Sequence, residues 1–222
     1  MSENKILNVD DAYALETPED SVRLYGEWAP DYDSGFVERV GYVLFRRVAE
    51  QFARHADRVH GAVLDVGCGT GSVGACLRES GIETIDGIDI SPEMLVEAGK
   101  KKTTNGDPVY RNLIQADLTT TLDIADDQYA GLVSAGTFTH GHLGPGPLDE
   151  LWRVAVPGAQ CAIGVRSTHY ESAGFARKLA AAVAAGTITE PKLVEVDLYT
   201  AETPNREHAN DKALVVVCQI AK

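Results

Sequence analysis

Positive charge is scarce in this chain. Its 222 residues include 33 Asp and Glu but only 20 Lys and Arg, which gives a formal net charge of −13. Nucleic-acid binding depends on clustered Lys and Arg that displace counterions, and anionic membrane surfaces attract the same side chains. The charge balance therefore argues against a nucleic acid or a membrane surface as the partner.

Cysteines are few and long hydrophobic runs are absent. The four cysteines, Cys68, Cys76, Cys161 and Cys218, form no C-x-x-C pair, which favours reduced thiols over disulfides or a zinc site. No apolar run reaches the roughly 20 residues that span a bilayer. The polar, acidic N-terminal stretch does not resemble a secretory signal. These features predict a cytoplasmic protein.

The most informative stretch of the chain is residues 63–71. A short apolar run that includes Asp65 predicts a buried parallel strand. Three glycines then allow a tight turn and remove side chains that would block a ligand: Gly67, Gly69 and Gly71. The helix expected next offers unpaired N–H groups at its start. This arrangement holds a nucleotide-like ligand at the carboxyl edge of a sheet.

A second motif follows at a matching distance. Asp89 ends the next predicted strand 20 residues after Gly69, where an acidic residue binds ribose hydroxyls. Ser91 is a typical N-cap, with Pro92 at the first helical position and Glu93 in the first turn. The segment therefore predicts a strand, a ribose-binding acid and a new helix in immediate succession.

Together the motifs at 65–71 and 87–95 resemble the first two motifs of class I S-adenosylmethionine-dependent methyltransferases. This resemblance implies S-adenosyl-L-methionine as the cofactor. It also implies a seven-stranded sheet in the order 3-2-1-4-5-7-6, with the last strand antiparallel. Gly69, Gly71 and Gly74 also satisfy the G-x-G-x-x-G pattern of NAD-dependent oxidoreductases, which remain an alternative. Asp65 and the residues after Asp89 favour the methyltransferase.

Hydrophobic periodicity alternates between strand and helix patterns, which predicts an α/β, Rossmann-like, doubly wound sheet. We expect one methyltransferase domain over residues 1–222, with an N-terminal helical cap at 1–60 and the core at 61–222. Strands are expected at 62–66, 83–89, 110–115, 129–135, 160–166, 193–199 and 214–220. Helices are expected at 71–80, 92–102, 148–154 and 173–185, with one long amphipathic helix within 35–60.

The resemblance also implies a cofactor site. Asp65 and the glycines would surround the methionine part, Asp89 would accept hydrogen bonds from the ribose, and Asp117 would contact the adenine amino group. An alternative for Asp117 is a turn cap. Aromatic side chains before residue 33 could stabilise the sulfonium by cation–π contacts or could be plain core. The expected cofactor-binding residues are Tyr25, Trp28, Asp65, Gly67, Cys68, Gly69, Gly71, Asp89, Ile90, Met94, Ala116, Asp117, Leu118, Gly136 and Thr137.

Candidate acceptor-site residues lie mainly in the loops after the fourth and fifth strands. His140 and Tyr170 are the candidates for catalysis, His140 because an imidazole can serve as a general base and Tyr170 because of its position. Ordinary loop structure is the alternative for His140. Substrate contacts are expected from Tyr32, His142 and Arg166. No metal is expected at His140 and His142, since no third ligand is spaced nearby.

The acceptor is expected to be a small molecule that receives the methyl group by in-line displacement. The chain lacks the Asn/Asp-Pro-Pro-aromatic motif and the Pro-Cys nucleophile of nucleic-acid methyltransferases. The loop at 137–145 further resembles the Williams–Beuren-region methyltransferase-like branch, a resemblance that implies no particular substrate. We expect a monomer or homodimer. A non-catalytic cofactor-binding interaction module is the alternative from a different functional class.

Overall fold

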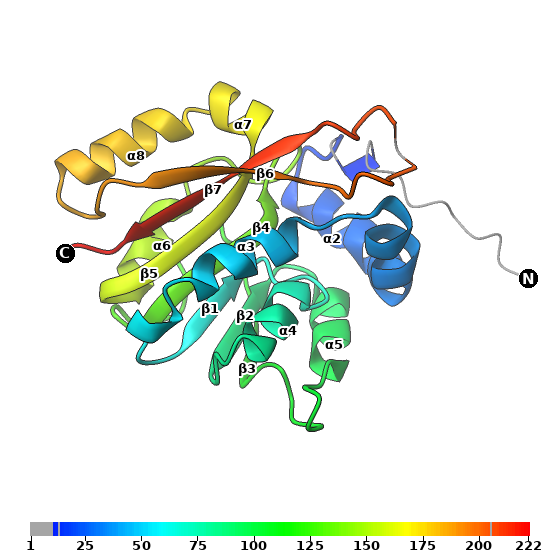
Figure 1. Cartoon of the computed structure of the whole chain (residues 1–222), viewed down its shortest axis with the longest axis horizontal. Coiled ribbons are helices and arrows are strands. Elements are labelled where there is room, and N and C mark those ends of the chain that lie inside the picture. Colours follow the sequence, from blue (N-terminus) through cyan, green and yellow to red (C-terminus); the bar gives the residue numbers. More distant parts are fainter. Residues whose placement is uncertain (1–10, 13, 205) are drawn as a thin grey trace, which may run out of the picture.

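The computed structural model describes residues 11, 12, 14–204 and 206–222. Its strands form one seven-stranded sheet in the order β3-β2-β1-β4-β5-β7-β6 (Figure 1). The pairs from β3 to β5 are parallel, whereas β7 runs antiparallel to both β5 and β6. The predicted fold class, strand order and antiparallel last strand are confirmed. Residues 1–10 and 13 of the expected cap lie outside the described residues.

The elements alternate along the chain as the periodicity predicts. The strands are β1 (Val63–Val66), β2 (Ile85–Asp89), β3 (Asn112–Gln115), β4 (Tyr129–Phe138), β5 (Ala155–Arg166), β6 (Lys192–Asp197) and β7 (Lys212–Gln219). The α-helices are α2 (Pro18–Trp28), α3 (Leu44–Ala53), α4 (Ser72–Glu79), α5 (Pro92–Lys100), α6 (Leu148–Val154), α7 (Ser167–Ser172) and α8 (Phe175–Ala184). Short helical segments complete the cap and its connection to β1, at Ala29–Asp31, Tyr32–Glu38 and Ala56–Arg58.

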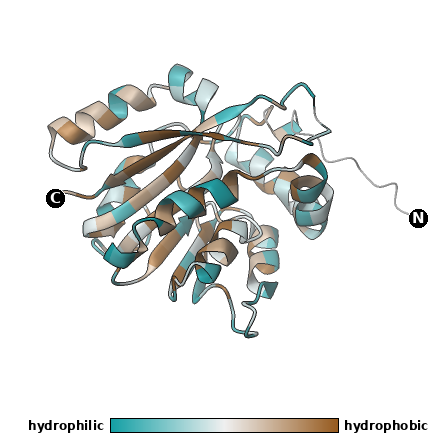
Figure 2. Ribbon diagram, viewed as in Figure 1, coloured by the Kyte–Doolittle hydropathy of each residue, from teal (hydrophilic) through white to brown (hydrophobic). Residues whose placement is uncertain are grey.

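Two hydrophobic cores lie on opposite faces of the sheet. Successive strand residues point to opposite faces, so Val63 packs with α3, α4 and α5, and Leu64 packs with α6 and α8. All four residues of β1 are buried. Apolar residues therefore dominate the central strands, which Figure 2 shows in brown between the helical layers.

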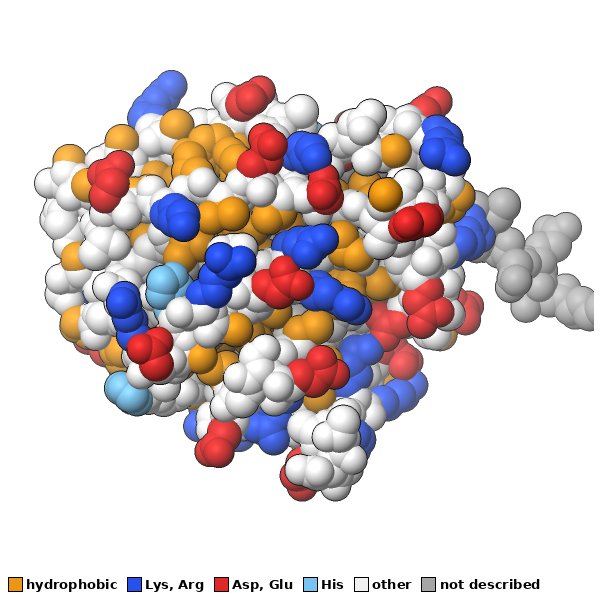
Figure 3. All heavy atoms as spheres, viewed as in Figure 1, with side chains coloured by type: hydrophobic (Ala, Val, Ile, Leu, Met, Phe, Trp, Pro, Cys, Tyr) orange, Lys and Arg blue, Asp and Glu red, His pale blue; other side chains and the backbone are white. Residues whose placement is uncertain are grey.

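The face shown in Figure 3 carries both signs of charge. Basic and acidic side chains are interspersed across it, with hydrophobic atoms visible between them. In the part of the chain that the structure describes, no helix combines the length and apolarity that crossing a membrane requires.

The prediction of one long helix within 35–60 is wrong in its extent. A π-helical segment ends at Glu38, and only α3 is a regular α-helix in this region. Between them the backbone bonds to the segment after β6: the Val43 amide donates to the Leu198 carbonyl at 2.8 Å, and the Thr200 amide donates to the Gly41 carbonyl at 2.8 Å. These distant partners replace the bonds that a continuous helix would make.

Smaller corrections concern the ends of elements. β4 runs three residues beyond the expected end, to Phe138, with an irregular register against β5 after Ser134. β5 starts at Ala155, directly after α6. The helix expected from residue 173 begins at Phe175 and is preceded by the separate helix α7. The longer β4 carries its end further toward the edge where the cofactor motifs lie, whereas β5 ends at Arg166 as expected.

Candidate active site

The glycine-rich loop between β1 and α4 forms the floor of the site. Gly67 has φ +64°, and a Cβ atom there would lie 2.0 Å from the Thr137 hydroxyl oxygen. Only glycine therefore lets the loop approach β4 this closely. Gly69 also has a positive φ of +52°, and a Cβ there would meet no atom within 4 Å. The backbone at Gly69 thus borders open space, which a ligand can fill.

Asp89 joins the end of β2 to this loop. Its Oδ2 atom accepts a hydrogen bond from the Gly69 amide at 2.8 Å, and its Oδ1 atom accepts one from the Ser91 amide at 2.9 Å. The Ser91 hydroxyl oxygen in turn accepts from the Met94 amide at 3.2 Å and caps α5, as predicted. Burial raises the pKa of Asp89, although these backbone hydrogen bonds oppose the rise.

Asp65 lies beneath the loop and outside the cavity, in contrast to its expected contact with the methionine part. Its Oδ2 atom accepts hydrogen bonds from the Tyr110 hydroxyl at 2.6 Å and the Gly74 amide at 3.1 Å. Burial raises the pKa of the Asp65 carboxyl to about 7. Asp65 therefore supports the loop by joining α4 to the segment before β3.

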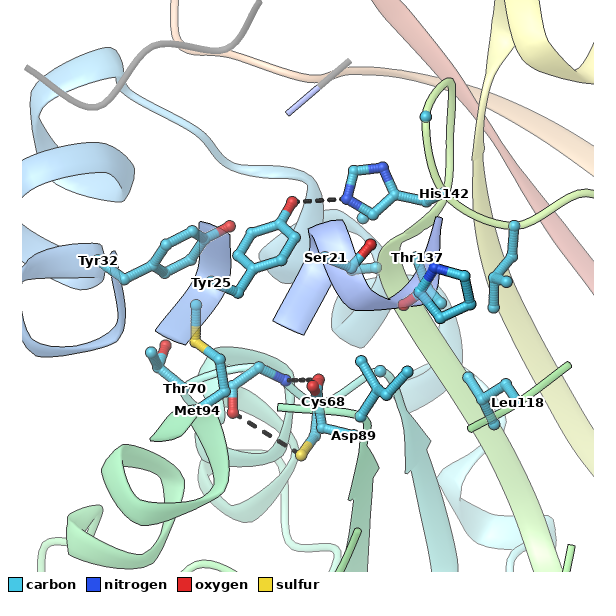
Figure 4. Close-up of a pocket in the computed structure, with 18 of the residues that line it drawn as sticks. Ser21, Tyr25, Tyr32, Cys68, Thr70, Asp89, Met94, Leu118, Thr137 and His142 are labelled. Carbon is cyan, nitrogen blue, oxygen red and sulfur yellow. Dashed lines mark hydrogen bonds between the residues drawn. The ribbon is translucent and has the colours of Figure 1, made fainter. Parts of the chain in front are cut away.

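A cavity of about 310 Å³ lies above the loop, between the sheet edge and the N-terminal cap. It brings together residues that are far apart in sequence, from α2, the β1–α4 loop, the end of β2 and the loops after β3 and β4 (Figure 4). The expected site residues that line it are Tyr25, Tyr32, Gly67, Cys68, Gly69, Asp89, Ile90, Met94, Asp117, Leu118, Gly136, Thr137 and His142. Most of the predicted cofactor residues thus share one cavity.

Asp117 caps a turn, which was the alternative interpretation of this residue, and it also lies at the cavity. Its Oδ1 atom accepts from the Thr119 amide at 2.8 Å and from the Thr119 hydroxyl at 2.7 Å, so it caps the turn after β3. The same residue also lines the cavity. A carboxylate has about four lone-pair positions, so the turn leaves acceptor capacity for a ligand.

Aromatic rings of the cap form the wall opposite the loop. Tyr25 makes edge contacts with Trp28 at 5.7 Å and Tyr32 at 6.1 Å, and Tyr32 stacks on Phe36 at 5.2 Å between ring centroids. Tyr25 and Tyr32 face the cavity, whereas Trp28 is only 1% exposed and belongs to the hydrophobic core. Trp28 is therefore plain core, which was the alternative interpretation.

The cap is also tied to the cofactor loop. Asp33, in the π-helical segment, accepts a hydrogen bond from the Thr70 hydroxyl at 2.6 Å. Its other carboxylate oxygen forms an ion pair with Lys101, which follows α5. The carboxylate of Asp33 thus joins the cap to the glycine loop and to the residue that follows α5.

His142 lies in the cavity and His140 does not. The Nε2 atom of His142 lies 2.7 Å from the Tyr25 hydroxyl oxygen, a contact that Figure 4 shows. The Nδ1 atom of His142 lies 3.0 Å from the His140 carbonyl oxygen. Burial lowers the pKa of His142. The His140 ring instead lies 3.0 Å from the Thr168 hydroxyl, between Nε2 and Oγ1, on the α7 side. The structure therefore favours His142 over His140 for chemistry in the cavity.

Other expected residues also lie outside the cavity lining. The Arg166 guanidinium forms a 2.6 Å ion pair with Asp211, and the Tyr170 ring stacks on Phe175 at 5.9 Å. Gly71 and Ala116 adjoin lining residues but are not among them. The end of β5 turns into α7, which carries Arg166 and Tyr170 away from the cavity.

Sequence reasoning missed three lining residues in the region expected to form one long helix: Val37 in the π-helical segment, Phe45 in α3, and Tyr42 between these two elements. The apolar spacing of this region, which includes Val37, indicated one helix packed on the sheet. The break in that helix turns the three residues toward the cavity instead. A signal was present in Gly41, whose φ of +65° ends the helical conformation.

The charges that line the cavity are acidic. Among the described lining residues the charged side chains are Glu16, Asp89 and Asp117, with no Lys or Arg. Within the described part of the chain, no group of three or more His, Cys, Asp or Glu is arranged to hold a metal ion. The cavity therefore suits a ligand that carries positive charge near the glycine loop.

Part of the sequence is similar to known methyltransferases. Residues 63–158 match the family model described as a methyltransferase domain. The human methyltransferase-like protein 27 is 38% identical over 92 residues, which cover 39% of this chain and 36% of that protein. The chain therefore matches about a third of its relative's length. The family match concerns the segment from β1 to the start of β5.

Solved structures share the fold over nearly the whole chain. A putative S-adenosyl-L-methionine-dependent methyltransferase from Methanococcus maripaludis has a TM-score of 0.58 at 15% identity, covering 100% of this chain and 98% of its own. A putative methyltransferase in complex with the Trm112 activator, from Haloferax volcanii, has a TM-score of 0.60 at 19% identity, covering 89% and 98%. The [4+2]-cyclase SpnF has a TM-score of 0.64 at 14% identity, covering 93% and 97%.

Proposed function

We propose that this protein binds S-adenosyl-L-methionine in the cavity and transfers its methyl group to a small-molecule acceptor. The observation that carries the proposal is the position of Asp89, which lines the cavity beside the open backbone of Gly69. When bound, the cofactor would supply a methyl group that its sulfonium already activates. The protein would hold it in place, exclude water and align the acceptor.

The residues that line the cavity suit each part of the cofactor. Asp89 would accept hydrogen bonds from the ribose, and Ile90 would pack on the adenine beside Leu118. Gly67, Gly69, Gly136 and Thr137 would surround the methionine part. The acidic lining would complement the positive sulfonium and ammonium groups.

The same geometry disfavours an NAD-dependent oxidoreductase. In a dinucleotide site, backbone amides of the glycine loop point toward the negatively charged pyrophosphate. Here the Gly69 amide donates to the Asp89 carboxylate instead, at 2.8 Å. A pyrophosphate at that place would meet a like charge, without a Lys or Arg among the described lining residues to offset it.

The remaining expectations belong to the same proposal: one domain with a helical cap, a cytoplasmic location, a monomer or homodimer, and the Williams–Beuren-region methyltransferase-like branch. The similarity to SpnF concerns the fold alone. It nevertheless means that a protein named as a cyclase shares this architecture. Transfer of the labelled methyl group is therefore the readout that separates methylation from other uses of the fold.

The test is isothermal titration calorimetry of the full chain with S-adenosylmethionine, S-adenosylhomocysteine and NAD. We expect micromolar binding of the two sulfur compounds and none of NAD. Asp89→Ala should weaken S-adenosylmethionine binding at least tenfold, about 1.4 kcal/mol. The matched control is Asp107→Ala, because Asp107 is exposed in the loop before β3 and outside the cavity. Binding of NAD alone, or equal affinity in both variants, would contradict the proposal.

A further inference from the structure

The N-terminal cap covers the cavity on the side opposite the glycine loop. Tyr25 and Tyr32 of the cap line the cavity across from Asp89 (Figure 4). A cofactor held between these two walls would be shielded from water by the cap, and enzymes commonly exchange such ligands by opening the segment that covers them. We therefore expect movement of the cap to set how fast the cofactor enters and leaves.

The first helix of the cap is loosely packed on the rest of the protein. Of the 11 residues of α2, only Trp28 is buried. Segments with few buried apolar side chains open at a lower free-energy cost than the core does. Individual polar contacts between the cap and its neighbours can therefore decide how often the cap opens.

Asp33 makes such a contact beside the cavity. It follows Tyr32 in the π-helical segment, and its Oδ1 atom accepts a hydrogen bond from the Thr70 hydroxyl at 2.6 Å. Thr70 is only 3% exposed and comes directly after Gly69, whose amide donates to Asp89. Two successive residues of the glycine loop are therefore bonded in opposite directions, one to the end of β2 and the other to the cap.

The contact of Asp33 can break without disturbing the hydrophobic core. Among the described residues, Thr70 alone lines both the cofactor cavity and a second cavity of about 270 Å³, which Asp33 and Lys101 also line. The side chains of Asp33 and Lys101 are 43% and 24% exposed. An ion pair with this exposure contributes little, whereas a hydrogen bond from a buried hydroxyl to a carboxylate is among the stronger ones. The bond to Thr70 is therefore the stronger of the two contacts that Asp33 makes with the glycine loop and with Lys101.

We propose that Asp33 is a positioning residue that acts through Thr70, holding the cap closed over the cofactor and limiting how fast the cofactor enters and leaves. The inference rests on the proposed function. Asp33 is not among the described residues that line the cofactor cavity, so its effect on the ligand passes through the loop and the cap. Because the bond closes the cap in the free and in the bound protein alike, its loss speeds association and dissociation together. The Kd then changes much less than either rate constant.

The test measures the exchange of S-adenosylhomocysteine, which binds without turnover. Stopped-flow tryptophan fluorescence gives the association rate constant, displacement of labelled compound by excess unlabelled compound gives the dissociation rate constant, and calorimetry gives the Kd. Asp33→Ala should raise both rate constants at least tenfold, about 1.4 kcal/mol, and change the Kd less than about threefold. The matched control is Asp31→Ala, which removes the same charge from an exposed cap residue whose side chain makes no capping bond. This control should leave all three quantities unchanged.

Substitutions at Thr70 test whether the hydroxyl carries the effect. Thr70→Val removes the hydroxyl at nearly constant volume and should match Asp33→Ala, whereas Thr70→Ser retains the hydroxyl and should keep the wild-type rates. The double variant should exchange the ligand no faster than either single variant, since both changes remove the same hydrogen bond. Lys101→Met should alter the rates less than about threefold.

Three results would overturn the inference. They are an unchanged dissociation rate in Asp33→Ala, a faster dissociation that is matched in full by a weaker Kd, and additive effects of Asp33→Ala and Thr70→Val. The second result would mark a contact that stabilises only the bound state, and the third would mark two independent contacts. Failure of the wild type to bind S-adenosylhomocysteine would refute the proposed function and this inference with it.

Discussion

Replacing Asp65 by Asn should change how the stability of the fold depends on pH. Asp65 is fully buried, and only its Oδ2 atom has hydrogen-bond partners, the Tyr110 hydroxyl and the Gly74 amide. An Asn carbonyl oxygen can accept both bonds, and its amide group would occupy the place of Oδ1. The substitution therefore removes the ionisable group while retaining both hydrogen bonds.

The size of the effect follows from the pKa of Asp65, which burial raises from 3.8 to about 7. Between these values the folded protein holds a proton that the unfolded chain has released, so stability falls as pH rises. At 1.36 kcal/mol per pH unit, the loss between pH 4 and pH 8 amounts to about 4 kcal/mol. Asp65→Asn should remove most of this loss, and the variant should equal or exceed the wild type in stability at pH 8.

Urea unfolding followed by tryptophan fluorescence measures this effect, since Trp28 and Trp152 are both buried. The useful quantity is the difference in unfolding free energy between variant and wild type, taken at pH 5 and at pH 8. Groups with lowered pKa values, such as Asp86, act at lower pH and cancel in this difference. Parallel pH dependence of the two proteins would refute the reasoning.

Two further substitutions separate the loop from the histidines. Gly67→Val should weaken S-adenosylmethionine binding more than tenfold and lower the unfolding free energy by about 2–4 kcal/mol, because its Cβ would lie 2.0 Å from the Thr137 hydroxyl oxygen. Calorimetry measures the affinity and urea unfolding measures the stability. An unchanged affinity would contradict the assignment of the glycine loop as the floor of the site. His140→Ala should change cofactor affinity and kcat less than about twofold, because its ring bonds Thr168 outside the cavity. A large fall in kcat would return the catalytic role to His140.

The floor of the site could be predicted because its signals are local. A buried strand, closely spaced glycines, an acid at the next strand end and an N-cap depend on neighbours a few residues away. Ser91 caps α5 as predicted, and Asp89 lies at the edge of the cavity. The strand order came from the family resemblance, since periodicity identifies strands without ordering them.

The shape of the cap and the orientation of the two histidine rings could not be predicted, because they depend on distant hydrogen bonds and on a single backbone turn. The helix expected within 35–60 breaks because residues 41 and 43 bond to residues 198–200, a pairing that no local pattern contains. His140 and His142 flank Gly141, which has φ +76° and turns the chain between them. That turn decides which ring enters the cavity, and the sequence analysis placed the candidate base at His140, whereas His142 is the ring that lines the cavity.

The position of β7 has a consequence for synthesis of the protein. β7 lies between β5 and β6 and pairs with both, although β6 precedes it in the chain. On the ribosome β6 emerges before the strand it pairs with, whereas the strands from β3 to β5 can already associate. This part of the sheet is therefore completed only after residues 212–219 leave the exit tunnel, later than the strands from β3 to β5 can associate.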